Sequence, residues 1–165
     1  MSGGATKAAA SVAEWPSVED HAALRLWLNL LGTSQAVKSV IRYRLHDEFD
    51  TSLARFDFLA QLHRSPEGLR MQEISARLMV TGGNVTGLTD SLEQEGLVKR
   101  LADPDDRRAF RVSLTAAGRK LFTAMAKAHE EWIIAIFGAV SKREMQQIQE
   151  LLSKIKQHAQ REDRR

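Results

Sequence analysis

The sequence predicts a mainly α-helical chain with one small β-hairpin. Through most of its length, apolar side chains recur every three or four residues, which is the period of an amphipathic helix. Only 10 Gly and 3 Pro are present among 165 residues, so few breaks between helices are expected. The clearest alternation with a period of two is in Phe110–Leu114, which is typical of a half-buried strand.

Long helices are expected near both ends of the chain. The first should run from about Val18 to Asp47. Its apolar stripe consists of Leu24, Trp27, Leu28 and Leu31. Thr115 is expected to cap a helix that reaches about Gly138, and Ser141 with Glu144 forms a capping box for the last helix. These helices carry more apolar surface than a small domain needs, which indicates a partner surface and, most simply, a homodimer.

Three shorter helices and the hairpin are expected between them. The first includes Phe56–His63, the second covers Met71–Leu78, and the third begins at Thr81 as its N-cap and ends at Gly96 as its C′ residue. Its buried face is formed by Val85, Leu88 and Leu92. Strands Val98–Leu101 and Phe110–Leu114 then flank a polar turn that is rich in turn formers.

This order is a helix-turn-helix followed by a basic wing, which indicates binding to duplex DNA. Recognition helices contact base edges with their N-terminal residues, where Asn pairs with adenine and Thr contacts the thymine methyl. Arginine at a hairpin tip suits the minor groove. We expect Asp106 to hold an arginine, with Arg77 as a candidate partner. Taken alone, the turn also fits a solvated loop of mixed charge. The predicted DNA contacts are Arg77, Thr81, Gly83, Asn84, Thr86, Gly87, Arg107 and Arg108.

The chain resembles the MarR family of bacterial transcription regulators from about Ser17 to His158. The resemblance rests on four segments of the sequence, which are Leu53–Leu59, Gly83–Glu93, Gly96–Val98 and Leu114–Gly118. The family's wing commonly reads Asp-x-Arg-Asp-Arg-Arg. Here Asp105 stands where an arginine is usual, which calls one basic contact into question and leaves Arg107 and Arg108.

The resemblance implies an obligate homodimer, a palindromic operator and release from DNA when a small ligand binds between the dimer helices and the winged region. Repression is the family's default. We expect a flexible arm over residues 1–17, a helical dimerisation region over 18–48 and 116–160, and a winged helix-turn-helix over 49–115, together forming one folding unit.

The sequence also offers candidate residues for an effector site. Lys38 and Arg42 are four residues apart and share a helix face, with Tyr43 and His46 nearby. Apolar neighbours for a flat ring are Trp27, Leu31, Phe56 and Trp132. The chain is also similar to the branch of the family that senses hydroxycinnamoyl-CoA or related aromatic intermediates. The hypothesis is an aromatic carboxylate or its CoA thioester; the alternative is that the cations are solvated or contact phosphates and the aromatics are core.

Composition bears on the other classes of function. The chain has no cysteine, which excludes thiolate metal ligands and cysteine-based peroxide sensing. A metal-sensing regulator is an alternative, for which His46-Asp47-Glu48 or His129-Glu130 could supply nitrogen and oxygen ligands. The five histidines are scattered and match no metal motif, and the helical spacing of His129 favours a buried histidine. No nucleophile–base arrangement or phosphate loop is recognisable, so neither an enzyme nor a cofactor is expected.

A DNA-binding protein that is purely architectural and ignores small molecules is a further alternative. Net charge is only +3, with a sequence pI of about 9.4. The placement of the basic residues is therefore stronger evidence for nucleic-acid binding than their small excess. The chain has no apolar run of about 20 residues and no secretory h-region. We therefore expect a cytoplasmic protein without a membrane span.

Overall fold

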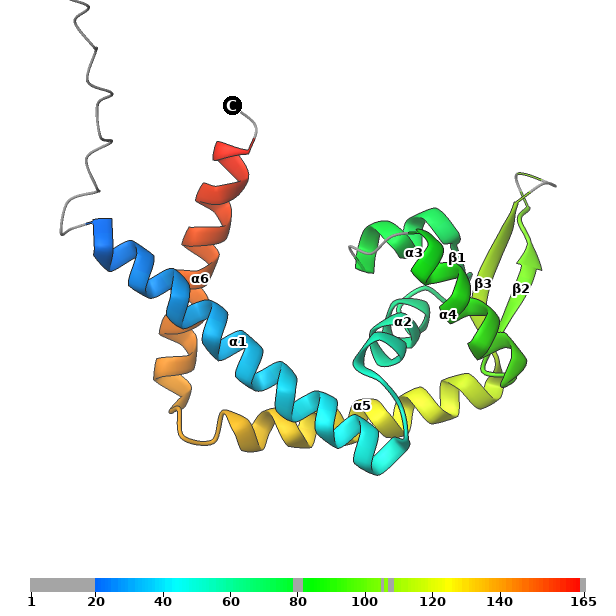
Figure 1. Cartoon of the computed structure of the whole chain (residues 1–165), viewed down its shortest axis with the longest axis horizontal. Coiled ribbons are helices and arrows are strands. Elements are labelled where there is room, and N and C mark those ends of the chain that lie inside the picture. Colours follow the sequence, from blue (N-terminus) through cyan, green and yellow to red (C-terminus); the bar gives the residue numbers. More distant parts are fainter. Residues whose placement is uncertain (1–19, 79–81, 105, 107–108, 164–165) are drawn as a thin grey trace, which may run out of the picture. The chain divides into compact units, whose positions relative to one another are not determined.

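The computed structural model describes residues 20–78, 82–104, 106 and 109–163. These residues form six helices and three strands (Figure 1). In chain order they are α1 (Asp20–Phe49), α2 (Leu53–His63), β1 (Leu69–Arg70), α3 (Met71–Leu78), α4 (Gly82–Gln94), β2 (Val98–Ala102), β3 (Phe110–Leu114), α5 (Ala116–Ile136) and α6 (Lys142–Glu162). The chain divides into two compact units, residues 1–39 and 40–165, with the boundary inside α1. The predicted fold class, mainly helical with a small winged hairpin, is confirmed.

Local capping determines where several helices begin and end. The Thr115 hydroxyl accepts a hydrogen bond from Gly118 N at 3.0 Å at the start of α5, and Ser141 forms the predicted capping box of α6 with Glu144. Gly96 ends α4 with φ of 71°, as expected for a C′ glycine. The proposed N-cap of α4, Thr81, lies outside the described residues.

The core of the second unit lies between α2, α3, α4 and the sheet. Figure 1 shows α3 and α4 side by side, with the β2–β3 hairpin next to α4. The strands are antiparallel in the order β1-β3-β2, with Leu69 opposite Val112 and Val98 opposite Leu114. The side chains buried here include Phe58, Leu59, Leu62, Leu69, Ile74, Val85, Leu92, Val98 and Val112. The sequence did not predict β1, because two residues are too few to show a period.

Rings from α2 and α5 pack together. The Phe56 ring centroid lies 5.6 Å from that of Phe122 and 4.9 Å from that of His129. The His129 centroid is 6.5 Å from that of Trp132, which is buried. At the start of α5, a Cβ on Gly118 would lie 1.9 Å from the Leu97 carbonyl oxygen, so only glycine allows α5 to approach that backbone so closely.

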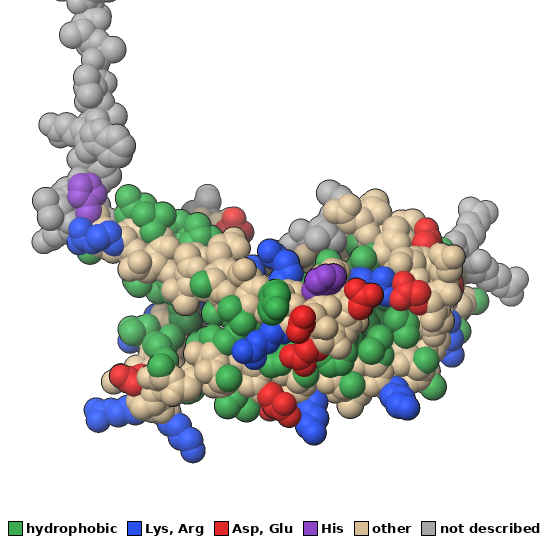
Figure 2. All heavy atoms as spheres, turned by 60° about the horizontal axis from the view of Figure 1, so that its bottom comes forward, with side chains coloured by type: hydrophobic (Ala, Val, Ile, Leu, Met, Phe, Trp, Pro, Cys, Tyr) green, Lys and Arg blue, Asp and Glu red, His purple; other side chains and the backbone are tan. Residues whose placement is uncertain are grey.

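Apolar side chains remain exposed on two helices. The α1 stripe of Leu24, Trp27, Leu28 and Leu31 is 43–58% exposed. In α6, Ile148, Leu151, Leu152 and Ile155 are 42–57% exposed and no side chain is buried. Figure 2 shows hydrophobic side chains at the surface of the visible face. In the described part of the chain, no helix combines the length and apolar character needed to cross a membrane.

Candidate nucleic-acid interface

The first two turns of α4 present a small, polar surface to solvent. Val85 is 1% exposed on the inner face, whereas Gly83, Asn84, Thr86 and Gly87 are all exposed. A Cβ added at Gly83 or Gly87 would meet no atom within 4 Å. Packing within the described chain therefore does not require glycine at either position. Glycine inside a helix is less favourable than alanine by about 1 kcal/mol, so its presence needs a reason outside this packing.

Hydrogen bonds along α4 separate an inner threonine from an outer one. Thr89 is fully buried and its hydroxyl donates to the Val85 carbonyl at 2.8 Å, a core role that the sequence analysis missed. Thr86 donates to the Gly82 carbonyl at 3.1 Å on the exposed face. Among the described residues, no hydrogen bond holds the Asn84 amide. The Asn84 amide is thus available to an external partner.

A buried carboxylate holds the base of the wing together. Asp103 Oδ2 accepts from Arg70 Nε at 2.7 Å and from Arg111 Nε at 3.0 Å, and its Oδ1 accepts from Arg70 Nη2 at 2.9 Å. The backbone N–H of Asp106 donates to the same carboxylate at 3.2 Å. The Asp103 side chain has no exposed surface. Asp103 therefore joins β1, β3 and the wing turn.

The expected pair of Asp106 with Arg77 is not formed. Arg77 Nη1 instead donates to Ser65 Oγ at 3.0 Å, in the loop after α2. Asp103 binds two arginines of the sheet, because the pairing of β1 with β3 brings Arg70 and Arg111 beside it. The sequence analysis described the turn that contains Asp103 only as polar and rich in turn formers, and no local signal marked the distant partner of this residue.

Ion pairs anchor the second half of α4. Arg100 of β2 binds Asp90 and Glu93 through its guanidinium, and its backbone N–H donates to Glu93 Oε1 at 3.1 Å. The hydrogen bond to Asp90 is the main cause that raises the pKa of Arg100. On the other side, Arg55 of α2 binds Glu95, and this hydrogen bond lowers the pKa of the Glu95 carboxyl. These contacts fix α4 against α2 and β2 and leave its first turns exposed.

Several residues predicted to contact DNA cannot be placed. Thr81, Arg107 and Arg108 lie outside the described residues, as does Asp105. The strands that lead into the wing turn are described, and Lys99 is exposed on β2. The structure thus brings together the exposed face of α4 and the base of the wing.

The predicted effector residues fall into separate environments. Trp27, Leu31 and Lys38 belong to the first unit and are exposed. In the second unit Arg42, Tyr43 and His46 are exposed, whereas Phe56 and Trp132 are buried. His129 contacts both of those rings, as expected for a packed histidine. Its burial lowers its pKa, and the charge of Asp57 partly opposes this.

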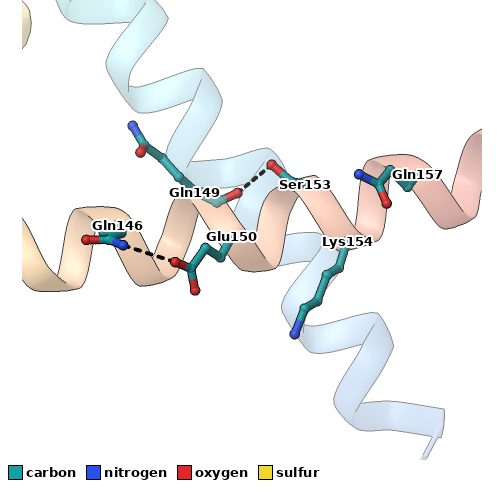
Figure 3. Close-up of a pocket in the computed structure, with 6 residues that line it drawn as sticks. All are labelled: Gln146, Gln149, Glu150, Ser153, Lys154 and Gln157. Carbon is teal, nitrogen blue, oxygen red and sulfur yellow. Dashed lines mark hydrogen bonds between the residues drawn. The ribbon is translucent and has the colours of Figure 1, made fainter.

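Two hollows in the surface differ in character. One of ≈ 340 Å³ lies between α2, α3 and α4, lined by Ala54, Asp57, Leu78, Asn84, Val85 and Leu88. The other, of ≈ 450 Å³, is lined only by polar side chains of α6 (Figure 3). There Gln146 Nε2 donates to Glu150 Oε1 at 3.2 Å, and Ser153 Oγ donates to the Gln149 carbonyl at 2.7 Å. Neither lining includes a predicted effector residue. Among the described residues, no three His, Asp or Glu side chains gather as potential metal ligands.

Comparison with known proteins identifies the family. The family model of MarR matches residues 51–110, from the start of α2 to the start of β3. An uncharacterised HTH-type transcriptional regulator of Bacillus subtilis, YkoM, is 32% identical over 130 residues, covering 77% of this chain and 83% of the relative. The chain belongs to the MarR family. The regulator PecS of Dickeya dadantii is 29% identical over 134 residues, with coverage of 78% and 81%.

Solved structures of MarR-family proteins share the fold. A MarR family transcriptional regulator from Silicibacter pomeroyi has a TM-score of 0.74 at 35% identity, covering 87% of this chain and 99% of that one. The S. aureus MepR–DNA complex has a TM-score of 0.68 at 26% identity, covering 79% and 96%. The chain is therefore a MarR-family DNA-binding transcriptional regulator, and the prediction that it is not an enzyme is confirmed.

Proposed function

We propose that this MarR-family regulator binds a palindromic operator as a homodimer, acts as a repressor, and leaves DNA when a small aromatic effector binds. The observation that carries the DNA-binding part is the exposed start of α4. Gly83 and Gly87 leave space that the protein itself does not fill, and Asn84 has an uncommitted amide. A smooth helix face with one base-reading side chain suits close approach to the major groove.

The wing supplies the second contact. Asp103 fixes the hairpin base beside α3 and α4, so that groove-reading helix and wing are held in one arrangement. The wing tip carries Arg107 and Arg108 in the sequence, and Arg77 adds an exposed cation on α3. Contacts of this kind neutralise phosphates and set the protein's register on the duplex.

Dimerisation is supported by the apolar faces that a single chain leaves uncovered. On α6, the stripe of Ile148, Leu151, Leu152 and Ile155 lies opposite the polar side chains drawn in Figure 3. Complete burial of a leucine side chain from water contributes about 1.5–3 kcal/mol, and these side chains have roughly half of their surface left to bury. We propose that residues 18–48 and 116–160 form the dimer and residues 49–115 bind DNA. Two recognition helices about 34 Å apart reach successive major grooves on one face of the duplex.

The decisive experiment is a footprint and a binding titration on DNA upstream of the protein's own gene, at fixed salt. Protection of one palindrome, with affinity far above that for scrambled DNA, is the expected result. Asn84→Ala should reduce the difference in binding free energy between operator and scrambled DNA by about 1–3 kcal/mol. Lys99→Ala should weaken binding to both DNAs alike. Similar binding to every sequence would instead identify an architectural DNA binder.

The proposed effector is an aromatic carboxylate or its CoA thioester, as expected for the branch that senses hydroxycinnamoyl-CoA. Its support is the chemistry of the residues on α1, α2 and α5. Lys38 and Arg42 are exposed cations one helical turn apart, and Phe56, His129 and Trp132 form a packed aromatic group. A metal or another ligand is the alternative effector. A regulator of this type acts in the cytoplasm, where bacterial DNA lies.

The effector is tested by adding aryl-CoA thioesters and their free acids to the preformed operator complex. Release by a thioester but not by its acid, weakened in Lys38→Ala and Arg42→Ala, would support a CoA ligand. Release by both compounds would support a carboxylate. If neither compound releases DNA or raises the melting temperature at millimolar concentration, this effector class is wrong and the DNA-binding proposal stands.

A further inference from the structure

An acidic side chain lies on the same outward face of α4 as the two exposed glycines. An α-helix turns by about 100° per residue, so Gly83, Gly87 and Asp90 fall within one narrow strip. The side chain of Asp90 is 58% exposed. The opposite face carries Val85 and Leu92, both buried. Whatever surface the glycines approach, Asp90 therefore faces it too.

Arg100 holds this carboxylate in place. Its Nη2 binds Asp90 Oδ1, while Nη1 binds Glu93 and the guanidinium lies 5.1 Å from the centre of the Phe110 ring. Glu93 also accepts from the Arg100 backbone N–H, so the arginine is attached at three points. Among the described residues, no hydrogen bond is made to Asp90 Oδ2. Asp90 thus offers one committed and one uncommitted acceptor.

A carboxylate is an unusual group to present to DNA. Phosphates repel it, and binding that is independent of sequence rests on cations that neutralise those phosphates. In the major groove, however, the cytosine N4 and adenine N6 amino groups are hydrogen-bond donors, and an acidic side chain accepts from cytosine N4. The repulsion between this carboxylate and the phosphates is therefore offset only where the DNA sequence places a base amino group opposite it.

We propose that Asp90 is a specificity-determining residue that accepts a hydrogen bond from the amino group of a cytosine in the major groove, with Arg100 as its positioning residue. Arg100 keeps Oδ1 engaged, offsets part of the negative charge and directs Oδ2 outward. Gly83 and Gly87 allow the helix to come close enough for this short side chain to reach a base. The inference rests on the proposed reading of an operator by α4. It adds a base pair to those read by Asn84.

The test compares binding to a set of operators in which each base pair of a half-site is changed in turn. Wild type, Asp90→Asn, Asp90→Ala and Asp47→Asn are measured at one salt concentration. Asp47→Asn is the control, because it removes one negative charge at an exposed position of α1, outside α4 and the Arg100 ion pairs. Both Asp90 variants should lose discrimination at one base pair by about 5- to 150-fold and keep it elsewhere. Asp47→Asn should keep the whole preference pattern.

A change in the DNA provides a second readout that does not depend on how the variants fold. Replacing the cytosine at that base pair by an analogue without its amino group should weaken wild-type binding and leave Asp90→Ala binding unchanged. Arg100→Gln should reduce discrimination at the same base pair, because the carboxylate is no longer held.

Three results would overturn the proposal. Tighter binding of Asp90→Ala to operator and scrambled DNA alike would mean that Asp90 only repels phosphates. An unchanged preference pattern in both Asp90 variants, with wild type still specific, would refute this inference and leave the proposed function intact. Absence of specific binding by the wild-type chain would refute both.

Discussion

Replacing Gly87 by alanine should change stability and DNA binding in opposite directions. Gly87 lies in the interior of α4, is exposed, and an added Cβ would meet no atom within 4 Å. The folded state accepts the methyl group without strain. Alanine is favoured over glycine inside a helix by about 0.8–1.0 kcal/mol, so the free energy of unfolding should rise by roughly that amount. For a chain of this size that is about 2–4 °C in melting temperature.

Gly87→Ala should also bind operator DNA more weakly than wild type does. If the helix face approaches the bases closely at Gly87, the methyl group must displace either DNA or helix. Forcing a methyl into a tightly packed contact costs about 1–3 kcal/mol, which corresponds to roughly a 5- to 150-fold weaker complex. Fluorescence anisotropy with labelled operator measures the affinity, and thermal unfolding at equal protein concentration measures the stability.

Ser153→Ala is the control. Ser153 is exposed on the polar face of α6, opposite the apolar stripe, and alanine has the higher helix propensity, so a smaller gain in stability is expected. Operator affinity should not change, and sedimentation should show the same dimer as for wild type. Wild-type operator affinity in Gly87→Ala, together with the expected gain in stability, would refute the close approach of α4 to DNA.

Three other changes probe the wing, the dimer and a histidine. Asp103→Asn removes the charge to which Arg70 and Arg111 bind, and should lower the free energy of unfolding by about 1.5–3 kcal/mol in chemical denaturation. It should also weaken binding to all DNA sequences alike. Leu152→Lys places a charge on the α6 apolar stripe and should yield monomers in sedimentation. Burial lowers the pKa of His129, so the unfolded chain binds the proton more readily. Stability should therefore fall as pH drops below about 6.5, and His129→Gln should flatten this fall in melting temperature.

Each of these changes has a control at an exposed site. Asp47→Asn should leave stability and DNA binding unchanged. If Asp47→Asn lowered the free energy of unfolding as much as Asp103→Asn does, the ion pairs of Asp103 would not be the cause of that loss. Gln149→Lys puts the same charge on the polar face of α6 and should leave the dimer intact; a dimer that persists in Leu152→Lys would place the interface elsewhere. His46→Gln should keep the wild-type loss of stability in acid. If His129→Gln shows that same loss, another group causes it.

The sequence by itself determined the features that depend on a few neighbouring residues. The hydroxyl groups of Thr115 and Ser141 cap α5 and α6, as predicted, because an N-cap contact spans only three residues. The glycine that ends α4, the extent of α3 and the period of β3 are equally local. Repeated apolar positions also predicted the exposed stripe of α1.

The tertiary structure alone decided which polar groups meet. Asp103 and Arg70 are 33 residues apart, and only the pairing of β1 with β3 brings them together. Arg100 reaches Asp90 because β2 returns along α4, which gives the outward acid a fixed position. Ion pairs of this kind leave no periodic trace in a sequence, since their partners are chosen by the path of the backbone. For that reason the position of α4 was predictable from the sequence, whereas the ion pairs that fix it against α2 and β2 were not.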